Sequence, residues 1–210
     1  MTELMYFTSD ALVSSAQVLE CAAMERGFVV VLDRTLFHPQ GGGQRADAGT
    51  IGHAAVQHVV AKDGVVEHRV DKRLPPGRVD MSIDPDRRAE SSRLHSAGHL
   101  VGNALQALGA RPTRAHHWPQ EAKVWFGGPI SGDPAEFLGR LQDLVDGYVA
   151  ADLDRVIAFD STRRTVKFGK LQEFSCGGTH VLRTGQIGRC RLIGIAASKM
   201  RGNYIEYAIR

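Results

Sequence analysis

Two pairs of zinc-binding residue types set the strongest constraint on how this chain can fold. His95 and His99 lie four positions apart, and so do Cys176 and His180, about eighty residues further along. Imidazole nitrogens and thiolates are donors that zinc prefers, and structural zinc sites use four of them. If both pairs bind one ion, the fold must bring these two distant regions together.

The local sequence supports a different setting for each pair. His95 and His99 fall in a segment with helical periodicity, where residues i and i+4 share one face. Cys176 and His180 enclose two glycines, which allow a backbone to approach a metal closely. We therefore predict a four-ligand metal site formed by a helix and a bend.

Two other chemistries match parts of this set. A metalloprotease helix needs a glutamate directly after its first histidine, but Ser96 stands at that position, so this general base is missing. A thiol nucleophile is the other alternative, with Cys176 as the thiolate and His180 as its base. That reading gives His95 and His99 no role, and so the metal site is preferred.

A run of three glycines, Gly41–Gly43, is the next unusual feature, within the segment HPQGGGQ. Three consecutive glycines lose much conformational entropy on folding and provide no side-chain packing. Such a loop allows a ligand to come close to the backbone, although a hairpin turn with a bulge is an equal alternative. The loop lacks the Lys-Ser/Thr ending of a phosphate-binding loop, so we expect no ATP site.

Composition and charge restrict the class of protein. The chain is 43% hydrophobic and 23% charged, which is typical of a globular protein. Its apolar runs are too short for a membrane span, no secretory leader opens it, and three cysteines cannot form a disulfide framework. We therefore expect a cytoplasmic protein that does not bind membranes.

Positive charge is concentrated near the C-terminus, where residues 161–210 contain ten Lys and Arg against two Glu. Such a segment can bind a polyanion such as RNA, and an equal alternative is that it forms a solvated sheet edge.

Periodicity predicts an α+β protein with a small β-barrel first. Asp84 and Pro85 begin a helix that ends at Gly109, and a second helix begins at Asp133. We expect one domain at residues 1–83, a barrel with the glycine-rich motif, and another at 84–210, a two-layer α+β zinc domain. The predicted strands are Leu4–Thr8, Phe28–Asp33, Thr50–Val60, Val65–Val70, Val79–Ile83, Ala122–Phe126, Val156–Phe159, Thr165–Phe168, Gly188–Ala196 and Asn203–Ile209.

Three motifs in this order resemble the free-standing alanyl-tRNA editing proteins of the AlaX type. The motifs are HPQGGGQRADAG (38–49), RLHSAGH (93–99) and SCGGTHVLRTGQIG (175–188), and the likeness extends from Tyr6 to Arg210. These proteins resemble the editing domain of alanyl-tRNA synthetase and, more distantly, that of threonyl-tRNA synthetase. The GGGQ segment places the chain with the medium-length members, which carry a β-barrel before the editing domain.

The resemblance implies a function and a set of site residues. It implies zinc-dependent hydrolysis of the ester that links serine, and as a second candidate glycine, to alanine-specific tRNA, by a protein acting in trans. His95, His99, Cys176 and His180 correspond to the zinc ligands and so to the catalytic centre. Gly41, Gly42, Gly43 and Gln44 correspond to the motif that accepts the wrong aminoacyl group. The alternative is a non-catalytic zinc-stabilised module that binds tRNA.

One segment departs from the family pattern. Many relatives carry a threonine after the histidine helix, where its hydroxyl can recognise serine. Here the segment is Arg111–Trp118, in which Thr113 is the candidate and His116 or His117 can take its place. The substrate pocket is therefore predicted to include these three residues.

Overall fold

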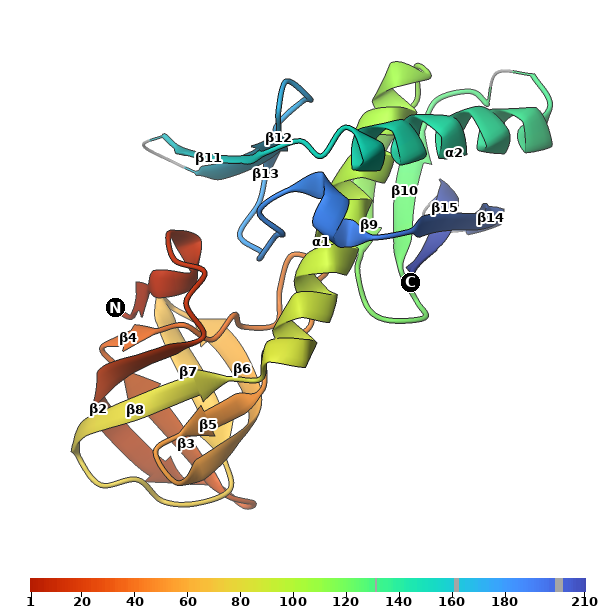
Figure 1. Ribbon diagram of the computed structural model, residues 1–210. Coiled ribbons are helices and arrows are strands. Elements are labelled where there is room, and N and C mark those ends of the chain that lie inside the picture. The colour runs from red at the N-terminus through yellow and green to blue at the C-terminus, as the bar shows by residue number, and fades with distance from the viewer. Residues whose placement is uncertain (131, 161–162, 199–201) are drawn as a thin grey trace. The chain divides into compact units, whose positions relative to one another are not determined.

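A computed structural model describes residues 1–130, 132–160, 163–198 and 202–210 (Figure 1). The described chain is mostly β, with two α-helices, α1 (Pro85–Ala107) and α2 (Pro134–Ala150), and two 3-10 helices, η1 (Met5–Phe7) and η2 (Thr184–Ile187). The strands are β1 (Glu3–Leu4), β2 (Val13–Ala23), β3 (Phe28–Leu32), β4 (Arg34–Thr35), β5 (Gly49–Ile51), β6 (Ala54–Lys62), β7 (Val65–Val70), β8 (Gly77–Ile83), β9 (Arg111–His116), β10 (Lys123–Gly127), β11 (Arg155–Phe159), β12 (Arg164–Phe168), β13 (Phe174–Ser175), β14 (Cys190–Ser198) and β15 (Gly202–Ile209).

The chain divides into two compact units. The first consists of Met1–Gly41 and Arg45–Ala89, and the second of Gly42–Gln44 and Glu90–Arg210. Three residues of the glycine-rich motif thus belong with the second unit, although they lie within the sequence of the first. Their contacts explain this, because the His117 amide donates to the Gly43 carbonyl at 2.9 Å and the Gln44 side chain bonds to Thr179.

The first unit is mainly β, with η1 and the first residues of α1 as its helical parts. Six antiparallel strands close into a barrel in the order β2-β3-β7-β6-β5-β8 (Figure 1). Alternate residues of each strand point inward, and the resulting core is mainly aliphatic, with Leu32, Ile51 and Met81 fully buried. The loop after β4 is tied by a buried ion pair, since the Arg88 guanidinium donates to both carboxylate oxygens of Asp47.

The second unit contains both sheets that surround the histidine pair. One sheet has the order β14-β15-β10-β9, and a smaller one has the order β11-β12-β13. Both helices share one core with the larger sheet, where Leu100, Phe137 and Tyr207 are buried. Helix α2 begins as predicted at Asp133, whose carboxylate accepts from the amides of Ala135 and Glu136.

Most predicted elements are present, and three of the differences have local causes. The predicted strand Leu4–Thr8 is wrong, because the chain turns into η1 after Leu4 and the Thr8 and Ser9 amides bond back to Met5. The predicted strand Thr50–Val60 is two strands, β5 and β6, joined by a turn with Gly52 at a φ of 54°. Strand β9 was not predicted, because a proline and two arginines obscure its pattern.

Candidate metal centre

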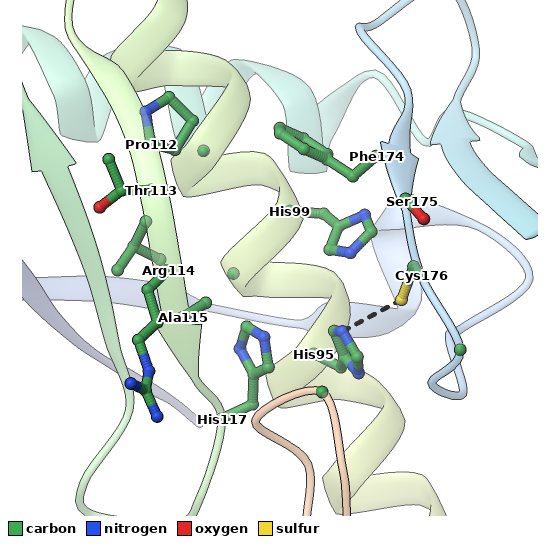
Figure 2. Close-up of a pocket in the computed structure, with 15 residues that line it drawn as sticks. His95, His99, Pro112, Thr113, Arg114, Ala115, His117, Phe174, Ser175 and Cys176 are labelled. Atoms are coloured by element: carbon green, nitrogen blue, oxygen red, sulfur yellow. Dashed lines mark hydrogen bonds between the residues drawn. The ribbon is translucent and has the colours of Figure 1, made fainter. Parts of the chain in front are cut away.

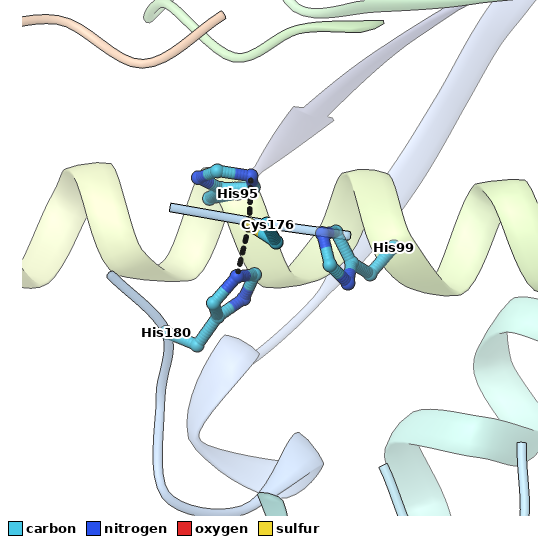
Figure 3. A group of neighbouring side chains, drawn as sticks. All are labelled: His95, His99, Cys176 and His180. Atoms are coloured by element: carbon cyan, nitrogen blue, oxygen red, sulfur yellow. Dashed lines mark hydrogen bonds between the residues drawn. The ribbon is translucent and has the colours of Figure 1, made fainter. Parts of the chain in front are cut away.

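Helix α1 carries the first donor pair into the core of the second unit. Leu94, Ala97 and Val101 pack into the hydrophobic core, and this fixes the rotation of the helix about its axis. His95 and His99 lie one turn apart beside that apolar stripe and are 3% and 8% exposed. The helix therefore presents both imidazoles on one face, as Figure 3 shows.

The second donor pair follows the short strand β13. Pairing of β13 with β12 places Cys176 at the end of the small sheet, and the Cys176 amide donates to the Arg164 carbonyl at 3.0 Å. The buried Arg164 guanidinium in turn donates to the carbonyls of Cys176 and Gly178, at 2.7 and 3.0 Å. This clamp gives the Cys-Gly-Gly bend a fixed shape.

The bend comes close to α1 because residue 178 has no side chain. A Cβ atom at Gly178 would lie 2.2 Å from Cε1 of His95 and 2.7 Å from Oε1 of Gln44. Any larger residue would push the bend away from the helix. The glycine is therefore required for the two donor pairs to meet.

The four donors converge on one point. The Cys176 Sγ atom lies 3.3 Å from His95 Nε2 and 3.2 Å from His180 Nε2, and the donor atoms of all four residues lie within 4.8 Å of one another. In a tetrahedral site with ordinary Zn–N and Zn–S bond lengths, sulfur and nitrogen are about 3.5 Å apart. The donor set and its spacing therefore fit a metal ion, and zinc is consistent with both.

Hydrogen bonds behind the donors orient two of the rings. The His95 Nδ1 atom lies 2.7 Å from Oε1 of Gln44, which leaves Nε2 directed at the cluster. Gln44 is held by the Thr179 amide at 3.0 Å and itself donates to the Thr179 hydroxyl at 2.9 Å. On the other side, His180 Nδ1 lies 3.1 Å from the Ser96 hydroxyl. Such partners fix the tautomer of a metal-binding histidine.

His99 differs from the other two histidines. Its Nδ1 atom is buried and has no hydrogen-bond partner among the residues that the structure describes. A buried polar atom without a partner is costly. The ring is held by packing instead, with an edge-to-face contact to Phe174 at 5.1 Å between ring centroids. One nitrogen of this ring lies within 4.8 Å of the donor atoms of the other three residues, as a shared metal site requires.

Burial favours the neutral form of His99, His180 and Cys176. Burial lowers the pKa of His99 to about 3 and that of His180 well below its usual value, so both rings are neutral at pH 7. Burial also raises the pKa of the Cys176 thiol, and the Gly178 amide and the Arg164 charge oppose this increase. A neutral thiol beside a weakly basic imidazole disfavours the thiol-nucleophile alternative.

A pocket of about 260 Å³ opens beside the donor cluster (Figure 2). One wall is a face of α1 with His95, Gly98, His99 and Gly102, and the opposite wall is strand β9. Gly42, His117, Val124 and the segment 174–177 complete the lining. The pocket thus combines three of the four donors with a glycine of the GGGQ motif.

Sequence comparisons relate this chain to alanine–tRNA ligases. Alanine–tRNA ligase from Methanopyrus kandleri is 31% identical over an alignment of 226 residues, covering 92% of this chain and 24% of the ligase. The chain is homologous to alanine–tRNA ligases. The corresponding enzymes of Streptomyces avermitilis and Haloquadratum walsbyi are 31% and 30% identical, over 79% and 85% of the chain and 22% of each ligase. No protein-family model matches.

The chain spans about a quarter of the length of these alanine–tRNA ligases. The alignment with the Methanopyrus enzyme extends over nearly the whole chain, so the homologous segment includes both compact units.

Among the residues that the structure describes, neither helix combines the length and apolar composition of a membrane span.

The predicted pocket residues occupy three different settings. Gly42, Thr113 and His117 line the pocket, and Thr113 is the extra residue of a β-bulge in β9. Gln44 lies behind His95 and is 1% exposed. His116 is not in the pocket lining but stacks on Trp118.

The other two glycines also differ. Gly43 has a φ of 80° and packs against β9, where a Cβ atom would lie 2.5 Å from the Ala115 carbonyl oxygen. Gly41 belongs to the first unit and is not in the pocket lining. Only the middle glycine of the run thus faces the pocket.

Several residues of the site were not identified from the sequence. Ser96, Thr179 and Arg164 support the donors, and Tyr207 lies behind the pocket. One sequence signal did exist, because Gly98 and Gly102 are helix-interior glycines that each cost about 1 kcal/mol relative to alanine. In the structure, a Cβ at Gly98 would lie 2.3 Å from the His117 ring, and one at Gly102 would lie 3.1 Å from Phe174.

Part of the positive charge in residues 161–210 is used in contacts within the protein. Arg164 is buried against the Cys-Gly-Gly bend, and Arg183 is paired with Asp152 at 2.7 Å and with Asp154 at 2.5 Å. Two further members of the set, Lys199 and Arg201, lie outside the described residues. Part of this charge is therefore structural.

Proposed function

We propose that this chain is a zinc-dependent deacylase that hydrolyses mischarged alanine tRNA, with serine as the first substrate and glycine as the second. One observation carries the proposal: four zinc-type donors converge beside a pocket in a chain homologous to alanine–tRNA ligases. Under this proposal, the matched segment corresponds to an editing region, residues 1–83 form its barrel domain, and residues 84–210 form its two-layer catalytic domain.

The reaction would add water across an ester. The water oxygen bonds to the carbonyl carbon of the aminoacyl group, the bond from that carbon to the ribose oxygen breaks, and a proton passes to the ribose oxygen. The products are a free amino acid and uncharged tRNA. An aminoacyl ester is already activated, and modest polarisation of its carbonyl is therefore sufficient.

Different residues of the chain would have different roles in this reaction. His95, His99, Cys176 and His180 would hold zinc, which when bound supplies Lewis acidity for ester hydrolysis. Gln44 and Ser96 orient two of these rings through hydrogen bonds of 2.7 and 3.1 Å. Gly42 borders the pocket, and a Cβ atom there would meet no atom within 4 Å. The loop therefore leaves space for the substrate beside its backbone.

The direct test measures release of amino acid from alanine tRNA charged with serine, glycine or alanine. We expect the zinc-loaded protein to hydrolyse the serine ester faster than the glycine ester and to spare the alanine ester. The same protein treated with a chelator should lose this activity and regain it with added zinc. A zinc-loaded protein that cleaves none of the three esters would refute the deacylase.

The number of protein ligands to the metal favours a second candidate function. Four protein ligands complete a tetrahedral zinc site, which is the usual arrangement of a structural metal. In that case the chain would be a zinc-stabilised module that binds tRNA without hydrolysing it. It would show tRNA affinity that falls steeply with salt, and no release of amino acid at any tRNA concentration.

A further inference from the structure

We infer that His117 is the specificity-determining residue of the pocket, and that its Nε2 atom accepts a hydrogen bond from the hydroxyl of a seryl group. This inference rests on the proposed deacylase function. It assigns to one imidazole the discrimination between serine and the amino acids that lack a side-chain hydroxyl, glycine and alanine.

The tautomer of His117 follows from a chain of hydrogen bonds. The Tyr207 hydroxyl donates its only hydrogen to the Leu94 carbonyl at 3.0 Å, since a carbonyl can only accept. The same hydroxyl lies 2.7 Å from His117 Nδ1, and it must accept there because its hydrogen is already used. Nδ1 therefore carries the proton, and Nε2 of a neutral ring is left with a free lone pair.

The free nitrogen is available to a ligand. His117 lines the pocket, and its Nε2 atom has no hydrogen-bond partner among the residues that the structure describes. The ring is stacked on His95, with centroids 4.2 Å apart and planes inclined by 22°. A small aminoacyl group bound beside the donor cluster would therefore lie within reach of His117.

The surrounding structure holds the imidazole in place. The His117 amide donates to the Gly43 carbonyl at 2.9 Å, which ties its backbone to the GGGQ motif. Its ring occupies a notch in α1 that exists because residue 98 is a glycine, where a Cβ atom would lie 2.5 Å from Nδ1. Tyr207 is buried and acts as a positioning residue, since it fixes the tautomer without lining the pocket.

A preorganised acceptor provides this type of selectivity. A site that hydrogen-bonds a substrate hydroxyl rejects the analogue that lacks it, because its buried polar group is then left unpaired. Thr113 also lines the pocket, but its side chain is exposed, and Figure 2 shows its hydroxyl oxygen directed away from His99. His117 is therefore better placed than Thr113 to select the hydroxyl.

The test compares kcat/KM for seryl and glycyl alanine tRNA in four variants. His117→Leu removes the acceptor at similar size, and we expect the ratio of serine to glycine activity to fall about tenfold, the effect of one neutral hydrogen bond. His117→Gln keeps an acceptor and should retain part of the ratio. Tyr207→Phe removes the hydroxyl that fixes the His117 tautomer. It should lower the ratio of serine to glycine activity less than His117→Leu does. His53→Leu, at an exposed barrel residue, is the matched control and should leave the ratio unchanged.

A binding measurement separates this inference from the proposed function. Non-hydrolysable adenosine analogues that carry a 3′-serylamide or 3′-glycylamide report selectivity even if no ester is cleaved. We expect His117→Leu to lose affinity for the seryl analogue only and to keep its zinc. Equal losses for both analogues, an unchanged ratio, or loss of zinc in His117→Leu would overturn the assignment. Failure of the wild type to hydrolyse any ester would overturn the deacylase alone.

Discussion

Two buried histidines, one in each compact unit, differ in how the protein satisfies their ring nitrogens. In the barrel, His68 Nε2 lies 2.8 Å from the Thr35 hydroxyl and Nδ1 lies 3.1 Å from the Val30 carbonyl. In the second unit, His99 Nδ1 has no partner among the described residues, and the ring lies within a group of zinc-type donors. Burial lowers both pKa values, to about 4 for His68 and about 3 for His99.

The difference separates a structural histidine from a binding one. A buried imidazole whose two nitrogens are both satisfied by the protein has completed its interactions and stabilises the fold. A buried imidazole with an unsatisfied nitrogen needs a further partner. Burial lowers the pKa of both rings and so does not distinguish these cases, whereas the position of His99 among three other zinc-type donors does.

The largest expected effect is on metal content. We expect His99→Gln and Cys176→Ala to lose most bound zinc and to reduce deacylation by a factor of a hundred or more, because each removes a donor from a four-ligand site. His68→Gln should retain the zinc and lose stability instead. Elemental analysis and thermal unfolding of the three purified variants would measure this. Full zinc retention in Cys176→Ala would contradict the ligand assignment.

The next effect concerns stability in acid. Because burial holds the pKa of His68 at about 4 against 6.5 in the unfolded chain, protons bind the unfolded state first as the pH falls. His68 should therefore contribute its full stabilisation above pH 6.5 and lose it progressively between pH 6.5 and 4, by about 3 kcal/mol in total.

Urea unfolding of wild type and His68→Gln, both in the same metal state, would show this contribution. The difference in unfolding free energy between the two proteins should decrease as the pH is lowered from 7 to 4. The difference cancels the titration of His99, His117 and His180, whose pKa values burial also lowers. A difference that stays constant with pH would show that His68 is not buried as a neutral ring.

The smallest effect tests the support of a donor ring. Gln44→Leu removes the acceptor 2.7 Å from His95 Nδ1 and should weaken zinc binding by about 10- to 100-fold, as loss of such partners does. Competition with a chromophoric chelator would measure the affinity. Gln57→Leu, at an exposed position of strand β6, is the matched control. Equal zinc affinity in both variants would remove Gln44 from the metal centre.

Local sequence patterns predicted most of the fold. The alternation of Val65–Val70 and the Asp133 cap appear in the structure as β7 and as the start of α2. The division of 50–60 into two strands depended on the left-handed backbone of Gly52, and one glycine in an alternating pattern does not reveal its φ. Strand β9 forms because β10 provides its partner, which is a tertiary effect that its own residues do not encode.

The sequence predicted the donor residues of the candidate site but not the residues that hold those donors in place. His95, His99, Cys176 and His180 have chemistry that is visible in a sequence, and the structure brings them together. The supporting groups are Ser, Thr, Gln and Arg side chains, which are common everywhere and gain a role only through contacts across 12 to 135 positions. Tyr207 likewise meets His117 only through folding.

The placement of Gly42–Gln44 in the second unit has a consequence for how this protein can be divided. A polypeptide that begins at Glu90 would contain all four donors, yet it would lack the amide that holds the His95 ring. Recombination that exchanges the barrel for another module must therefore carry the loop 42–44 along with it. The sequence of the first unit thus contains a piece that the second unit needs.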